Sequence, residues 1–215
     1  MKLITLDWEG TLVDFQWNLE EAVDETTRML LAKNIPQEVL IGLDYAAIYN
    51  LVREMSPRWG FRNGSLLALV DEIYDRYDLE AASRWVPAPD LDQTLAALKD
   101  FELALVSNIG RSCVKKMLDR LDLHDRFGMV ITRNDVSFLK PSPEGIIKAM
   151  SWAGVDKNET IHIGDSLSDL YAARNAGVKS GILLGGQSKP EELLPEKPDL
   201  VLDKLSDLPA ALTVL

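Results

Sequence analysis

From residue 87 onward, short apolar segments alternate with segments of helix length. The apolar segments are FELALVSN, FGMVITR, ETIHIGD and KSGILLG, and the helix-length segments span residues 91–100, 111–121, 143–154 and 167–176. One more strand and a closing helix fit the last segment, PDLVLDKLSDLPAALTVL. This alternation is typical of a parallel sheet with helices on both faces, because parallel strands need crossover connections. The chain is therefore predicted to be an α/β protein.

Residues 16–86 show a different pattern from the rest of the chain. Their apolar residues recur at spacings of three and four with charges between them, which is typical of amphipathic helices, and no strand pattern is present. The Pro-rich segment VPAPDLDQ ends this region and supplies Asp90 as a cap for the next helix. We therefore expect two domains, a sheet domain of residues 1–15 and 87–215 and an inserted all-helical domain of residues 16–86.

Composition and charge exclude several classes of protein. The 215 residues contain one cysteine, Cys113, so no disulfide can form within the chain. The formal net charge of −11 argues against nucleic acid as a partner, since phosphate backbones are bound mainly by clustered Lys and Arg. No apolar run approaches the roughly 20 residues that span a bilayer, and no leader pattern is present. We expect a cytoplasmic monomer or homodimer with no membrane partner.

Polar residues follow the predicted strands at the points where these strands end. Asp7 ends the first strand, Ser107 and Asn108 follow ELALV, and Asp165 follows IHIG, while Lys140 lies in the connection after MVITR. Parallel α/β sheets bind ligands beyond the carboxyl ends of their strands. These side chains are therefore expected to meet at one edge of the sheet.

Four segments that contain these residues resemble the motifs of the haloacid dehalogenase superfamily, in the same order. They are LDWEGTLVD, LVSN, LKPSPEGI and IGDSLSD, and together they cover almost the whole chain. The resemblance implies a Rossmann-like core with a cap domain inserted after the first motif, here a helical cap. Most members are Mg²⁺-dependent phosphatases, so it also implies hydrolysis of a small phosphorylated metabolite.

The resemblance further implies catalytic and metal-binding roles. Asp7 would attack phosphorus and form an aspartyl-phosphate, and Lys140 would hold this nucleophile and balance its charge. Glu9 would be the general acid and base. Mg²⁺ would reduce the repulsion between a carboxylate and a phosphate, with Asp7, Asp165, Asp169 and the Glu9 carbonyl as its expected ligands.

Phosphate binding is assigned in the same way to residues of the first two motifs. Ser107, with Asn108 beside it, would donate hydrogen bonds to the transferred phosphoryl group, whose oxygens need fixed donors. Gly10 would let backbone amides approach the phosphate, and Thr11 would steady the turn.

Glu9 is where the sequence departs from the family, because most phosphatase members have Asp at this position. Glu keeps the acid and adds one methylene. Two alternatives stay open beside the phosphatase, of which only the second follows from Glu9; an acid at this position argues against the first. One is a dehalogenase in which Asp7 attacks carbon without a metal, and the other is a catalytically impaired phosphate- or metabolite-binding protein.

Each candidate residue also has a purely structural interpretation. Asp beside Gly is common in turns, Ser and Asn are common helix caps, a Lys before Pro is often a solvated loop residue, and acids are favoured at helix N-termini. The residues concerned are Asp7, Ser107, Asn108, Lys140, Asp165 and Asp169.

The segment REMSPRWGFRNGS concentrates cationic and aromatic residues in an otherwise acidic chain. Arg53, Arg58, Trp59 and Arg62 could reach over the sheet and bind an anionic leaving group, since Arg matches carboxylate and phosphate oxygens. A solvated loop with ordinary helix-flanking charges is the alternative.

Overall fold

A computed structural model describes all 215 residues and contains one six-stranded sheet in the order β3-β2-β1-β4-β5-β6. Every pair of neighbouring strands is parallel, as the alternating pattern predicted. The strands are β1 (Leu3–Leu6), β2 (Glu102–Val106), β3 (Met129–Ile131), β4 (Thr160–Gly164), β5 (Lys179–Leu183) and β6 (Leu200–Leu202).

The central strands are apolar along their whole length because both of their faces are covered. Alternate residues of β1 and β2 point to opposite faces. Ile4 and Leu105 belong to a cluster with α5 (Arg111–Arg120), whereas Leu3 and Ala104 belong to a cluster with α6 (Glu144–Ala153) and α7 (Leu167–Ala176). This two-sided burial explains the continuous apolar runs of the sequence.

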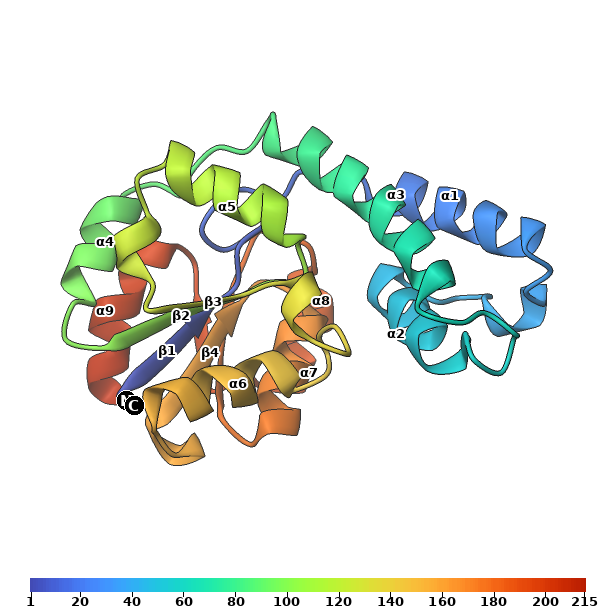
Figure 1. Cartoon of the computed structure of the whole chain (residues 1–215). Helices are drawn as coiled ribbons and strands as arrows, with labels where there is room; N and C mark the ends of the chain where they lie inside the picture. The colour runs from blue at the N-terminus through green and yellow to red at the C-terminus, as the bar shows by residue number, and fades with distance from the viewer.

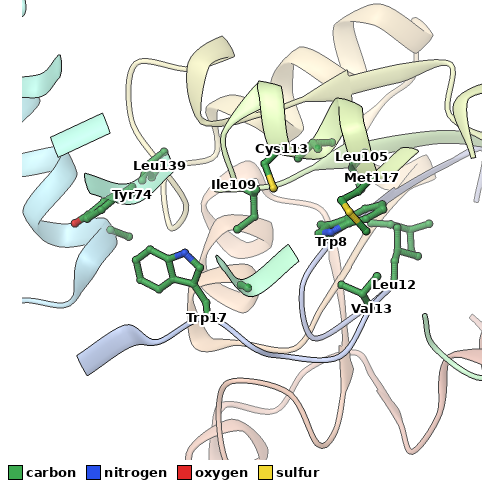
Figure 2. Close-up of a cluster of buried hydrophobic side chains, with 14 of the residues drawn as sticks. Trp8, Leu12, Val13, Trp17, Tyr74, Leu105, Ile109, Cys113, Met117 and Leu139 are labelled. Carbon is green, nitrogen blue, oxygen red and sulfur yellow. The ribbon is translucent and has the colours of Figure 1, made fainter. Parts of the chain in front are cut away.

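Helices cover the two faces of the sheet as predicted (Figure 1). On one face α6 and α7 pack against the strands, and on the other α5 lies with α4 (Leu91–Ala97) and α9 (Leu208–Ala211). A short helix, α8 (Pro190–Leu193), contributes Leu193 to a small cluster with Leu170 and Ile182. Figure 2 shows Trp8 and Leu12 close to Leu105 and to Met117 of α5, with Cys113 of the same helix beside Ile109.

The region of residues 16–86 contains three α-helices and no strand. These helices are α1 (Leu19–Ala32), α2 (Tyr45–Met55) and α3 (Ser65–Ala82), and they lie to one side of the sheet (Figure 1). The two segments that connect them to the sheet run side by side. The Asp14 N–H donates to the Val86 carbonyl at 2.9 Å, and the Val86 N–H donates to the Asp14 carboxylate at 2.7 Å.

One detail differs from the sequence-based expectations. Asp90 precedes α4, but its backbone has a φ of +58° and its side chain makes no capping hydrogen bond. Instead its carbonyl accepts from the N–H and hydroxyl of Thr94. The closing helix α9 has only four residues. None of the helices is both long enough and apolar enough to cross a membrane.

A buried guanidinium joins the loop after β3 to α3. Arg133 is 1% exposed, and its Nε and Nη1 atoms lie 3.0 Å from Asp71 and 2.9 Å from Asp78, while Nη2 contacts Asp75. The three aspartates are spaced by four and three residues, which places them on one face of α3. We call Arg133 and these aspartates the Arg133 cluster.

We predict that Arg133→Met lowers the free energy of unfolding by about 3–5 kcal/mol, because it leaves the buried Asp78 carboxylate without a counter-charge. Urea unfolding followed by circular dichroism measures this loss. The matched control is Arg111→Met, because the Arg111 side chain is 61% exposed and pairs with Asp135. It should cost no more than about 1 kcal/mol. Equal losses for the two variants would contradict a stabilising role for the Arg133 cluster.

Candidate active site

A pocket lies where the carboxyl ends of the strands approach the helices of residues 16–86. Six of the residues predicted from the sequence line it: Asp7, Glu9, Ser107, Asn108, Lys140 and Asp169. They come from distant parts of the chain and meet because the register aligns Leu6 of β1 with Leu105 of β2 and Ile163 of β4. The loops that follow these strands therefore leave the sheet at the same edge.

Lys140 occupies the centre of the charged part of this pocket. Its Nζ atom lies 2.6 Å from Asp7 and 2.6 Å from Asp169, and it donates to the Val106 carbonyl at 3.0 Å. An ammonium has three N–H donors, so all of them are used. Burial acts to lower the pKa of Lys140, but the two carboxylates outweigh burial and raise it. Lys140 is therefore a charged lysine and not a solvated loop residue.

Asp165 completes a buried group of three carboxylates with Asp7 and Asp169. One carboxylate oxygen from each lies within 4.8 Å of the others. Burial raises the pKa of Asp165, and the nearby charges of Asp169 and Asp7 raise it further. Burial also raises the pKa of Asp7, although Lys140 acts in the opposite direction. One ammonium does not balance these three carboxylates when all of them are ionised.

This donor set fits a hard divalent cation, because such cations prefer carboxylate oxygens. Asp165 does not line the pocket itself, and one of its oxygens accepts from the N–H of Gln187. Gly10 makes room for it. A Cβ atom at Gly10 would lie 2.1 Å from Asp165 Oδ2, and the φ of Gly10 is +79°. Glycine is therefore required here by both space and backbone conformation.

Asp169 differs from the other two carboxylates because both of its oxygens already have partners. Oδ1 contacts Lys140 and lies 3.0 Å from His162 Nε2, while Oδ2 accepts from the N–H and hydroxyl of Ser166. His162, which is buried, also contacts the Thr5 hydroxyl at 2.8 Å. Burial opposes ionisation of Asp169, but Lys140 and His162 lower its pKa. These contacts suit a residue that supports Lys140 better than a direct metal ligand.

Glu9 is held by both segments that lead to the helices of residues 16–86. Its Oε1 atom accepts from the Gln16 N–H and from Trp85 Nε1, each at 2.7 Å. Glu9 is 6% exposed, and burial raises its pKa to about 7 although these two donors act in the opposite direction. A carboxyl group with a pKa near neutral can both donate and accept a proton.

Ser107 and Asn108 lie beside Lys140 at the pocket wall. Asn108 Oδ1 accepts from the Lys140 N–H at 3.0 Å, and Asn108 Nδ2 donates to the Tyr45 hydroxyl at 3.0 Å. Neither residue caps α5, since Gly110 occupies the N-cap position. The helix-cap interpretation of these two residues is therefore wrong.

Two of the expected phosphate-binding residues do not line the pocket. Gly10 faces Asp165, and Thr11 is buried in the turn after β1.

Several pocket residues carry little or no signal in the sequence. Tyr45 begins α2, Asp78 belongs to α3, and Arg133 follows β3. None of them lies within a family motif. Arg133 ends the predicted segment FGMVITR, which is its only signal, whereas Tyr45 and Asp78 are revealed only by the packing of α2 and α3.

The cationic segment after α2 lies elsewhere. None of Arg53, Arg58, Trp59 and Arg62 lines the pocket, and Arg53 and Arg62 line a separate one. Tyr45 at the first residue of α2 faces the active-site pocket, whereas these residues lie near or beyond the last residue of that helix. The prediction that they bind the leaving group is not supported by this arrangement.

Comparison with known proteins agrees with the four motifs. Residues 1–177 match the family described as haloacid dehalogenase-like hydrolase. The chain is 30% identical over 214 residues to a phosphoglycolate phosphatase of Aquifex aeolicus, covering 97% of this chain and 95% of that protein. It is 29% identical over 215 residues to a phosphoglycolate phosphatase of Photorhabdus laumondii, covering 97% and 91%.

A solved structure shares the fold. A HAD-superfamily hydrolase from Geobacter sulfurreducens superposes with a TM-score of 0.63 at 18% identity, and all of both chains is covered. Because the family match covers residues 1–177, which is most of the chain, the chain belongs to the haloacid dehalogenase-like hydrolases.

Proposed function

We propose that this hydrolase is a Mg²⁺-dependent phosphatase that hydrolyses a small phosphorylated metabolite through an aspartyl-phosphate on Asp7. The observation that carries the proposal is the position of Asp7, a buried carboxylate that lines the pocket, 2.6 Å from Lys140 and close to Asp165 and Asp169. The relatives named phosphoglycolate phosphatases support the same class of reaction.

In the first step Asp7 attacks phosphorus, the bond from phosphorus to the alcohol oxygen breaks, and Glu9 gives a proton to the leaving alcohol. In the second step Glu9 accepts a proton from water, which attacks the phosphorus and releases phosphate and Asp7. Lys140 holds the Asp7 carboxylate throughout. Mg²⁺ bound by Asp7, Asp165 and the Glu9 carbonyl would supply positive charge against the phosphate oxygens, with Asp169 in support.

Ser107 and Asn108 are proposed to donate to the phosphoryl oxygens, because both line the pocket beside Lys140. Gly10 and Thr11 are proposed to shape the turn that brings backbone amides to the phosphate. Residues 16–86 would form a cap over a core of residues 1–15 and 87–215. The paired segments around Asp14 and Val86 would then be the hinge.

We expect Asp7→Asn to lower phosphate release by at least ~10³-fold, because the amide cannot act as the nucleophile. Release of inorganic phosphate from a panel of small phosphate esters, with Mg²⁺ and with EDTA, measures this loss. Asp203→Asn is the control, because this exposed aspartate does not line the pocket. Turnover that survives Asp7→Asn or EDTA would contradict the mechanism. A broad panel without turnover would support the alternative of an impaired binding protein.

Glu9→Gln should lower kcat by about 10²–10⁴-fold, because the amide can neither donate nor accept the catalytic proton. Glu9→Asp keeps the acid and shortens it by one methylene, so it tests the reach of the side chain. We expect it to retain more activity than Glu9→Gln and less than the wild type, since a displacement of about 1 Å can cost on the order of 100-fold. Undiminished activity of Glu9→Gln would exclude Glu9 as the acid and base.

Trp85→Phe should lower kcat by about tenfold and leave KM nearly unchanged, because it removes the N–H that holds Glu9 and keeps an aromatic ring. Steady-state kinetics on the best ester measures both constants. Trp152→Phe, on the 39% exposed Trp152, is the control for loss of an indole outside the pocket. A rise in KM with kcat unchanged would show that Trp85 affects binding and not the position of Glu9.

A further inference from the structure

Beside its charged and polar residues, the pocket has one apolar section of its wall that is largely aromatic. Phe15, Trp17, Leu19, Tyr45 and Ile109 contribute to it. The rings of Trp17 and Tyr45 lie with their centroids 5.0 Å apart, and Trp17 packs edge-on against Tyr74 of α3 (Figure 2). The Tyr45 hydroxyl already accepts from Asn108. This wall can bury apolar surface, but it carries no charge of its own.

The two cationic side chains of the pocket are both occupied by groups of the chain itself. All three donors of the Lys140 ammonium contact Asp7, Asp169 and the Val106 carbonyl. Arg133 is 1% exposed and donates to Asp71, Asp75, Asp78 and the Asn108 carbonyl. The ammonium therefore has no donor left for an anionic group of a substrate beyond its phosphate. The guanidinium uses four of its five N–H donors and already faces three carboxylates.

The surroundings of Arg133 would also repel such a group. Three carboxylates face one guanidinium in the Arg133 cluster, and Asp78 itself lines the pocket. Its Oδ1 accepts from Trp17 Nε1 at 3.0 Å, so the acidic cluster directly adjoins the aromatic wall. A substrate carboxylate placed beside Asp78 would lose water and meet an excess of like charge, which is costly in a buried site.

We infer that the leaving group of the substrate is an uncharged alcohol with an apolar or aromatic body, and not a carboxylate-bearing alcohol such as glycolate. This inference rests on the proposed phosphatase function and names its substrate class. It separates this chain from the relatives named phosphoglycolate phosphatases, to which it is 30% and 29% identical.

Binding of two phosphonates in the presence of Mg²⁺ tests the inference without requiring turnover. The probes are 2-phenylethylphosphonate and 3-phosphonopropionate, which mimic benzyl phosphate and phosphoglycolate with a methylene in place of the bridging oxygen. Isothermal titration calorimetry should give a Kd for the phenyl compound that is lower by at least about tenfold. An equal or higher Kd would overturn the inference, and so would the absence of binding by both compounds.

Kinetics on the matching esters tests the proposed function separately. We expect kcat/KM for benzyl phosphate to exceed that for 2-phosphoglycolate by at least about tenfold. Tight binding of the phenyl phosphonate without turnover of either ester would reject the phosphatase and keep the pocket preference. Faster turnover of 2-phosphoglycolate would keep the phosphatase and reject the preference.

A pair of variants at Leu19 tests whether the preference for an uncharged leaving group is caused by the lack of a free cationic side chain in the pocket. Leu19→Lys adds a positive charge at the pocket wall, and Leu19→Gln is a polar control of similar length without the charge. Leu19→Lys should shift the binding ratio toward 3-phosphonopropionate by about tenfold relative to Leu19→Gln. Equal ratios for the two variants would show that charge does not govern the preference and would overturn the inference.

Discussion

The arrangement of this molecule depends on the buried ammonium of Lys140. It connects the end of β1 through Asp7, the end of β2 through the Val106 carbonyl and the start of α7 through Asp169. Breaking a buried ion pair by removing one partner is strongly destabilising, because the remaining charge stays buried without compensation. The group that positions the candidate nucleophile is therefore also a group that holds the sheet edge together.

Asp169 extends this ionic group into the sheet and the helix beside it. Its carboxylate joins Ser166 in the capping box of α7 and contacts His162 of β4, which in turn contacts Thr5 of β1. A hydrogen-bonded network in a buried site restricts the orientation of each member more than a single pair does. Contacts from Thr5 of β1 and His162 of β4 therefore orient Asp169. Asp169 in turn fixes the rotamer of Lys140 and the orientation of Asp7.

The sequence predicts the features that follow from strand order and from local pattern. Asp7, Ser107 and Asp165 could be placed at one edge because each ends an apolar run, and that edge is where parallel strands finish together. The partners of Glu9 and Arg133 could not be predicted in this way. Trp85 is 76 residues from Glu9, and Asp78 is 55 residues from Arg133. No strand register relates them, so these pairs depend on how α3 packs against the loops of the sheet.

The contacts of Glu9 with Gln16 and Trp85 explain why a side chain one methylene longer than Asp suits this position. Its carboxyl group lines the pocket and also accepts from Gln16 on one connecting segment and Trp85 on the other. The two segments are themselves joined through Asp14 and Val86. Because Glu is one methylene longer than Asp, Glu9 Oε1 can accept from both Gln16 and Trp85 while the carboxyl group still reaches the pocket. The position of the proposed acid is then tied to the position of the helices of residues 16–86, since any shift of these segments moves the two donors that hold it.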